Sequence, residues 1–232
     1  MKSFLKKNFL IFFLIILALV FYANVVESLM LHIIFKPLIV ISLLVYLFME
    51  DGQKEKAVAF AFAGLIMSLL GDILLIFQSE NPLFFIGGLI SFLLAHVAYI
   101  FYYLRSSNTV AVKQLKSKPV FISMMVIYGI VFCLLLYNNL GGLKVPVFLY
   151  TTVLIGMNIF ALNRFGKVSD KSFKLIMIGA ICFALSDSLL AINKFLLPLP
   201  LAGVWILGSY AAAQYFITKG VLSKEVIERK VK

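Results

Sequence analysis

The chain contains 232 residues, of which 63% are hydrophobic and 13% are charged. A soluble domain has about 45–50% apolar and about 25% charged residues, so this composition excludes a soluble globular enzyme, a disordered tail and a disulfide-rich secreted domain. At about 20 residues for each membrane-spanning helix, the length leaves room for eight or nine spans with short loops. Cys133 and Cys182 both lie in apolar runs, where they are expected to fill the core.

The net charge of +11 does not indicate a nucleic-acid-binding protein. The basic residues lie almost entirely between the apolar runs, and there is no basic stripe with interleaved aromatic residues. We therefore expect no nucleic-acid partner. The excess of lysine instead indicates a fixed orientation in the bilayer and contact with anionic membrane lipids.

Eight uninterrupted apolar stretches predict an all-α, polytopic membrane protein with eight transmembrane helices. Pro119 and Pro146 fall in the first turn of their stretches, where proline is tolerated. The predicted helices cover residues 8–26, 31–49, 57–77, 83–104, 119–138, 143–163, 174–193 and 200–218.

The distribution of lysine and arginine predicts that both termini are cytoplasmic. With that orientation 18 of the 21 basic residues lie on the inner side, and only Lys36, Lys144 and Lys194 lie at or near the outer face. The first stretch follows three lysines, as a signal peptide would, but cleavage after Ala23 would place bulky Phe21 where a small residue is needed, so we expect a retained helix. A composition rich in Lys, Ile and Phe with few Arg suggests a bacterial source and hence the inner membrane.

Two segments of the chain resemble each other at an offset of 115 residues. Residues 64–77 and 179–192 share six identities in fourteen positions, and Asp72 aligns with Asp187. An offset of four spans preserves the direction of travel, so we predict a 4+4 parallel repeat with a pseudo-two-fold axis along the membrane normal. Chance similarity between two Leu-rich helices is the alternative. We predict a single transmembrane domain over residues 1–232, with possible repeat halves at 1–110 and 111–232.

Only two of the ten acidic residues, Asp72 and Asp187, lie inside apolar runs. A carboxylate near the bilayer centre costs about 2.5–3.5 kcal/mol on insertion scales and should face the bundle interior or a wet cavity. A rise of 1.5 Å per residue places Asp72 about 7–8 Å and Asp187 about 9 Å below the outer ends of their predicted helices. The two carboxylates therefore share a depth in the outer half of the membrane, and the repeat axis would let them face one another.

Two carboxylates in one site of low dielectric constant favour sharing a single proton. The protonated and the ionised group would then be a general acid and a general base, which makes Asp72 and Asp187 the candidate catalytic residues. The alternative is that each aspartate only forms a hydrogen bond with a neighbouring helix.

Other polar residues inside the predicted spans are candidates for binding a polar substrate. His96 and Tyr99 share one face of the fourth helix, and Tyr210 and Gln214 share one face of the eighth. These four side chains would line the cavity or, alternatively, form interhelical hydrogen bonds. Lys36 would extend to the outer headgroups or neutralise a substrate phosphate near the aspartates.

Several kinds of catalytic site are excluded by the residues present. Two histidines and no cluster of Cys or His cannot build a three-histidine zinc site. The sequence has neither a G-x-S-x-G motif nor a P-loop. We therefore expect carboxylate chemistry with no metal and no cofactor.

Five segments of the chain carry recognisable motifs: FKPL at 35–38, SLLGDILL at 68–75, IGGLISFLLAHVAYIFYY at 86–103, ALSDSLLA at 184–191 and YAAAQYFI at 210–217. The G-D and S-D helices and the intervening H-x-x-Y are the most specific of them. These motifs resemble the YhhN family of membrane proteins, and the likeness extends over nearly the whole chain.

The resemblance implies a lysoplasmalogenase, which hydrolyses the vinyl ether bond of an alkenyl-glycerophosphoethanolamine or -choline to a fatty aldehyde and a glycerophospho-base. The implied partners are a lysophospholipid substrate and membrane lipids. From the residues alone, a small proton-coupled transporter could use the same buried carboxylates, although neither half has the paired Gly- or Pro-broken helices that usually form such sites. A structural membrane protein is a third possibility, but it would not need a buried pair of aspartates.

Overall fold

The computed structural model describes residues 2–51, 56–107 and 119–223. Within these ranges the chain forms eight α-helices and two short 3-10 helices, η2 (Tyr137–Asn139) and η3 (Gly141–Leu143), between the fifth and sixth. The α-helices are α1 (Lys2–Val25), α2 (Leu29–Asp51), α3 (Val58–Ile76), α4 (Pro82–Arg105), α5 (Pro119–Leu136), α6 (Lys144–Leu162), α7 (Asp170–Phe195) and α8 (Ala202–Leu222).

The prediction of an all-α fold is confirmed, and each helix coincides with one predicted apolar stretch. In the described part of the chain, seven helices, α1 to α7, are long and apolar enough to cross a membrane. The helix α7 begins four residues before its predicted start, because its first turn is polar and is capped by Ser169, whose side chain accepts a hydrogen bond from the Ser172 amide. An apolar run does not reveal such a turn.

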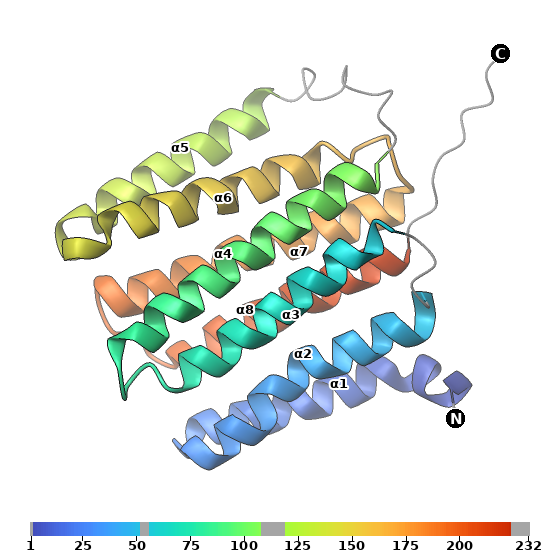
Figure 1. The fold of residues 1–232 in the computed structure, drawn as a ribbon, viewed down its shortest axis with the longest axis horizontal. Coiled ribbons are helices and arrows are strands. Elements are labelled where there is room, and N and C mark those ends of the chain that lie inside the picture. Colours follow the sequence, from blue (N-terminus) through green and yellow to red (C-terminus); the bar gives the residue numbers. More distant parts are fainter. Residues whose placement is uncertain (1, 52–55, 108–118, 224–232) are drawn as a thin grey trace.

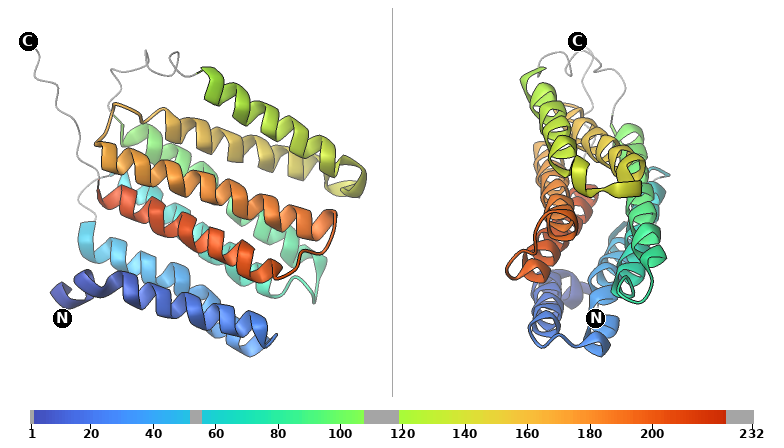
Figure 2. Two further views of the ribbon diagram at one scale, coloured as in Figure 1. Left: turned by 180° about the vertical axis from the view of Figure 1, so that it is seen from behind. Right: turned by 90° about the vertical axis from the view of Figure 1, so that its left-hand side faces the viewer.

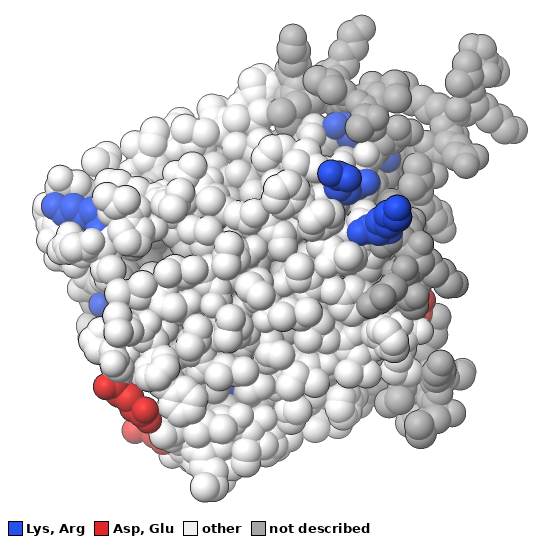
Figure 3. All heavy atoms as spheres, viewed as in Figure 1, with Lys and Arg blue, Asp and Glu red and all other residues white. Residues whose placement is uncertain are grey.

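The helices lie side by side and successive helices run in opposite directions (Figure 1). The pair α1 and α2 forms one edge of the bundle, α5 and α6 form the other, and α3, α4, α7 and α8 lie between them (Figures 1 and 2). We call the end that holds the α1–α2, α3–α4 and α7–α8 connections the distal end. Figure 3 shows a broad surface almost without charge between the two ends, as expected of helices that face lipid.

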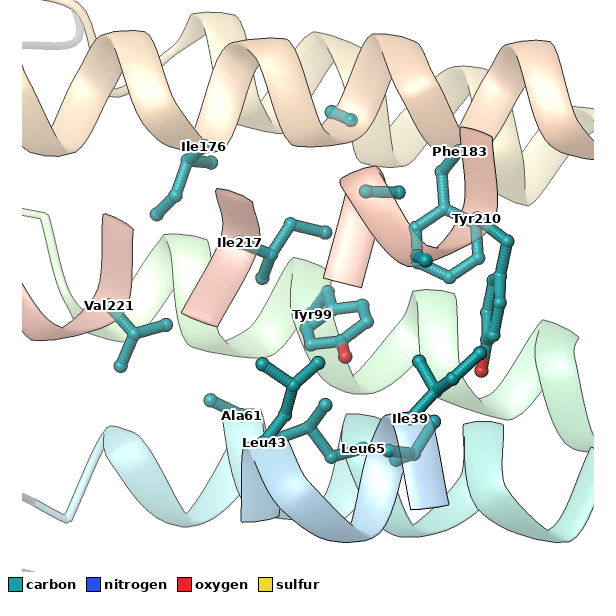
Figure 4. Packing of buried hydrophobic residues seen from close by; sticks show 14 of the residues in the cluster. Ile39, Leu43, Ala61, Leu65, Tyr99, Ile176, Phe183, Tyr210, Ile217 and Val221 are labelled. Carbon is teal, nitrogen blue, oxygen red and sulfur yellow. The ribbon is translucent and has the colours of Figure 1, made fainter. Parts of the chain in front are cut away.

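One hydrophobic cluster connects the edge pair α1 and α2 to the central helices and α6. It includes Leu43 on α2, Leu65 on α3, Phe183 on α7 and Ile217 on α8, which meet in the middle of the bundle (Figure 4). By contrast, only 11% of the apolar segment that contains α5 is buried. The helix α5 is therefore held mainly by its neighbour α6.

Glycines allow the closest helix pairs to approach. A Cβ atom on Gly64 would lie 2.6 Å from the ring of Tyr99, which brings α3 against α4. A Cβ atom on Gly179 would lie 2.7 Å from Ile217, which brings α7 against α8. Small residues at helix contacts are typical of membrane bundles, where close packing replaces the hydrophobic effect between helices.

Arg164 lies at the end of the bundle opposite the distal end, in the connection between α6 and α7, and is completely buried. Its guanidinium donates hydrogen bonds to the side chains of Ser106 and Ser172, at 3.1 Å for the second. It also lies 5.3 Å from the ring centre of Tyr102. Burial lowers the pKa of this guanidinium, but its ordinary value is so high that the group stays charged. Arg164 thus ties α4 to the start of α7.

Candidate active site

A cavity of about 290 Å³ opens among α2, α3, α7 and α8 in the distal half of the bundle. Both Asp72 and Asp187 line it. The two carboxylates thus share one space, although they are far apart in the sequence. Its polar side chains are Asn24, His32, Lys36, Asp72, Gln78, Ser186, Asp187, Asn193 and Tyr210.

Asp72 lies on α3, four residues before the end of the helix, and is 1% exposed. The hydroxyl of Tyr210 on α8 donates a hydrogen bond to its Oδ2 at 2.6 Å. The ammonium of Lys36 on α2 lies 3.6 Å from Oδ1 and donates a hydrogen bond to the Asp72 main-chain carbonyl at 3.4 Å. A buried carboxylate is tolerated when it is paired and hydrogen-bonded, and these two partners supply both conditions for an ionised Asp72.

Asp187 lies on α7, and its side chain is 12% exposed. The hydroxyl of Tyr150 on α6 donates a hydrogen bond to its Oδ2 at 2.8 Å. The Nε2 atom of His96 on α4 lies 3.5 Å from the same oxygen. The imidazole of His96 is completely buried and packs edge-on against the rings of Tyr150 and Phe183. The surroundings of Asp187 thus differ from those of Asp72, because no lysine or arginine forms an ion pair with it within the described ranges.

A chain of buried hydrogen bonds connects Asp72 to the centre of the bundle. The hydroxyl of Tyr99 donates to Oε1 of Gln214 at 2.6 Å, and Nε2 of Gln214 donates to the Tyr210 hydroxyl at 3.3 Å. Because Tyr210 accepts from Gln214, its own proton is directed to Asp72. Figure 4 shows Tyr99 and Tyr210 among the buried residues between α4 and α8.

The predicted site residues fall into two groups. Asp72, Asp187, Lys36 and Tyr210 all line the cavity. His96, Tyr99 and Gln214 are not among its lining residues; they lie in the bundle interior, each 0% exposed. Their contacts hold the groups that line the cavity, since His96 packs behind Asp187 and Gln214 orients Tyr210.

Sequence reasoning missed several polar groups at the cavity. Tyr150, which donates to Asp187, was not singled out. His32 also lines the cavity, and its position one turn before Lys36 on α2 is a signal that could have identified it. Asn24 and Asn193 lie at helix ends, where asparagine is common, so nothing in the sequence marks them as cavity residues. No group of three or more His, Cys, Asp or Glu side chains that could hold a metal ion occurs within the described residues.

The apolar helices and the buried carboxylates define an integral, multi-pass membrane protein with a polar cavity between its helices. The sequence profile of the YhhN family matches residues 31–221. The chain therefore belongs to the YhhN family.

Curated relatives give this family membership a chemical context. The chain is 27% identical over 171 residues to the lysoplasmalogenase TMEM86A of Bos taurus, covering 72% of this chain and 67% of that protein, and it is equally similar to the Homo sapiens TMEM86A. It is 31% identical over 156 residues to a lysoplasmalogenase of Mycobacterium tuberculosis, covering 67% of this chain and 58% of that protein. No solved structure is significantly similar to the chain.

Proposed function

We propose that this protein hydrolyses the vinyl ether bond of lysoplasmalogens and releases a fatty aldehyde and a glycerophospho-base. The observation that carries the proposal is the cavity that Asp72 and Asp187 share, with Lys36 in its wall. The relatives named lysoplasmalogenase support the choice of substrate. The reaction needs a proton donor, an anion and an oriented water molecule, and two carboxylates can supply all three.

The two aspartates have different roles in the proposed mechanism. Asp187 donates a proton to the second alkenyl carbon, which leaves an oxocarbenium ion at the first. Asp72, kept ionised by the neighbouring Lys36 ammonium, stabilises this cation and takes a proton from the water that attacks the first carbon. The resulting hemiacetal then breaks its bond to the glycerol oxygen. Asp72 returns its proton to that oxygen and Asp187 takes the proton of the hemiacetal hydroxyl, which gives the aldehyde and a free glycerol hydroxyl and restores both carboxyl groups to their starting states. Tyr210 holds Asp72 and Tyr150 holds Asp187 through their hydrogen bonds.

The polar wall of the cavity suits the glycerophospho headgroup. His32 and Lys36 lie one helical turn apart on α2 and both line the cavity, so they can approach the phosphate together. The side chains of Asn24, Gln78 and Asn193 lie around the same cavity and can donate hydrogen bonds to phosphate or glycerol oxygens. In this proposal the headgroup lies at the distal end and the ether bond lies deeper, at the aspartates.

We propose that α8 is an eighth membrane span and that both termini are cytoplasmic. The helix α8 has 21 residues, long enough to cross a bilayer, and it packs closely against α7. Two of its polar residues, Gln214 and Thr218, are buried in the bundle interior. The distal end would then face outward from the cytoplasm, which is the inner-membrane orientation in a bacterium.

We also propose a single domain over 1–232 with 4+4 repeat halves at 1–110 and 111–232. The contacts between helices support it, because α1–α2, α2–α3 and α3–α4 contacts are matched by α5–α6, α6–α7 and α7–α8 contacts, and the α2–α8 contact is matched by α6–α4. Tyr99 and Gln214, which share a hydrogen bond, are 115 residues apart, the offset of the repeat.

The partners of the aspartates support the same repeat. Asp72 on α3 is contacted by a side chain of α2 and by one of α8. Asp187 on α7 is contacted by a side chain of α6 and by one of α4. Each aspartate thus has a partner from the second helix of its own half and a partner from the fourth helix of the other half.

Three lipids test the proposed reaction. Purified protein is incubated with a lysoplasmalogen, its ester-linked analogue and its saturated-ether analogue, and aldehyde release is measured. We expect aldehyde from the lysoplasmalogen alone, and loss of release in both Asp72→Asn and Asp187→Asn while each variant remains extractable as folded protein. Turnover close to the wild-type rate in both variants would contradict the mechanism. Uptake into liposomes driven by a pH gradient, without aldehyde, would indicate the transporter instead.

A further inference from the structure

A second, apolar pocket lies on the other side of Asp187 from the headgroup wall. It is lined by residues of α4, α5, α6 and α7. Asp187 and Leu190 line both this pocket and the polar cavity, so the two spaces meet at the carboxylate. Its apolar walls include Phe85, Leu89, Phe132, Val147, Ala191 and Phe195.

We propose that this apolar pocket binds the first carbons of the alkenyl chain, so that the vinyl ether bond lies across Asp187 at the junction of the two spaces. This inference rests on the proposed function. It names the part of the substrate that each space takes: the glycerophospho headgroup in the polar cavity and the hydrocarbon chain in the apolar pocket.

The chemistry of the reaction requires the chain to pass close to the acid. The carbon that Asp187 protonates is also the carbon from which the hydrocarbon chain continues. A chain directed into the polar cavity would displace water from the groups that bind phosphate. A chain directed past Leu190 and Ala191 enters apolar surroundings instead, which favour burial of its methylene groups.

The size and position of the pocket indicate where the rest of the chain goes. The pocket is small, about 40 Å³, so it holds only the carbons next to the reacting bond. At the distal end the rings of Phe85 and Phe195, which both line the pocket, meet edge to face with centres 5.9 Å apart. On the α5 side the helix is mostly exposed, so the remaining carbons extend past α5 into the surrounding lipid.

Filling the pocket tests this path. Ala191 lies one turn after Asp187 on α7, and Ala191→Phe places a ring in the pocket. The matched control is Leu185→Phe, on the same helix at a side chain that is 52% exposed. Each protein is assayed with hexadec-1-enyl and with ethenyl glycerophosphoethanolamine, because the ethenyl compound has the reacting bond but no further chain.

We expect Ala191→Phe to lower kcat/KM for the long substrate at least about tenfold relative to the ethenyl compound, the scale on which a hydrophobic pocket discriminates. Leu185→Phe should leave the ratio of the two substrates unchanged. An unchanged ratio in Ala191→Phe, whether both activities survive or both fall together, would overturn the chain pocket.

Photolabelling gives a measurement that does not depend on hydrolysis. The probe is the saturated-ether lysophospholipid with a diazirine on the third chain carbon, added to the wild-type protein in liposomes. We expect labelled peptides from α5 and α6, with less labelling in Ala191→Phe. Labels confined to α1 and α2 would overturn the inference. Labelling of α5 and α6 by a protein that releases no aldehyde from any substrate would leave the pocket in place and reject the proposed function.

Discussion

Replacing Lys36 by methionine tests whether a cation keeps Asp72 ready for catalysis. The Lys36 ammonium lies 3.6 Å from Oδ1 of Asp72, and at an effective dielectric constant of about 20 the attraction is about 4–5 kcal/mol. Part of it offsets the cost of removing the ammonium from water, which leaves a net effect of about 2–3 kcal/mol. Because Asp72 stabilises the transition state in the proposed mechanism, we expect kcat to fall about 30- to 150-fold when its ion pair is removed.

The assay is aldehyde release from lysoplasmalogen by purified protein, with kcat and KM measured separately. Lys144→Met is the matched control, since Lys144 also lies at the distal end but stacks on the Tyr137 ring, 3.9 Å from its centre. Lys36→Arg keeps a positive charge and should retain more activity than Lys36→Met. A Lys36→Met variant whose KM rises while kcat stays unchanged would refute the reasoning, because Lys36 would then serve only the headgroup.

Three further changes test the packing around the site. Gly64→Ala should destabilise the protein by about 1–3 kcal/mol in a detergent unfolding assay, because its Cβ would lie 2.6 Å from the Tyr99 ring. The control is Gly142→Ala, whose Cβ would have no atom within 4 Å and which should unfold like the wild type. A double-mutant cycle of Tyr99→Phe and Gln214→Leu should give a coupling energy of about 1 kcal/mol; additive effects would argue against their 2.6 Å hydrogen bond. Arg164→Met should cost about 2–4 kcal/mol in the same unfolding assay, because it removes both hydrogen bonds to serine side chains, and an unchanged unfolding midpoint would contradict this role.

The helices were predictable because an apolar stretch of about 20 residues is a direct consequence of bilayer thickness. The depth of Asp72 and Asp187 followed from the helical rise alone, and both side chains do line one cavity. Their partners were harder to find. The spans are apolar on nearly all sides, so their periodicity does not show which face meets which neighbour, and Tyr150 could not be assigned to Asp187.

Polar residues inside a membrane helix turn inward whether they bind a substrate or only a neighbouring helix. In the sequence, His96, Tyr99 and Gln214 therefore cannot be distinguished from polar residues that line a cavity. The structure packs all three in the bundle interior instead. Lys36 shows the same ambiguity. Its place near the end of a span suggests that it extends to the headgroups, but a carboxylate 3.6 Å away on the next helix holds it at the cavity.

The proposed repeat explains how one fold could produce an acid and a base at the same depth. In the proposed repeat, corresponding helices bring one partner from each half to each aspartate, yet the chemical groups differ. Asp72 receives a lysine ammonium at 3.6 Å, while Asp187 receives the Tyr150 hydroxyl and the buried His96 imidazole. Carboxylates in unlike surroundings can hold different protonation states, which acid–base catalysis requires. Giving Asp72 a tyrosine in place of its lysine, as Asp187 has, should therefore impair the proposed reaction even though both carboxylates remain. A Lys36→Tyr variant is expected to lose aldehyde release while keeping its fold, and wild-type kcat in that variant would show that the asymmetry is not needed.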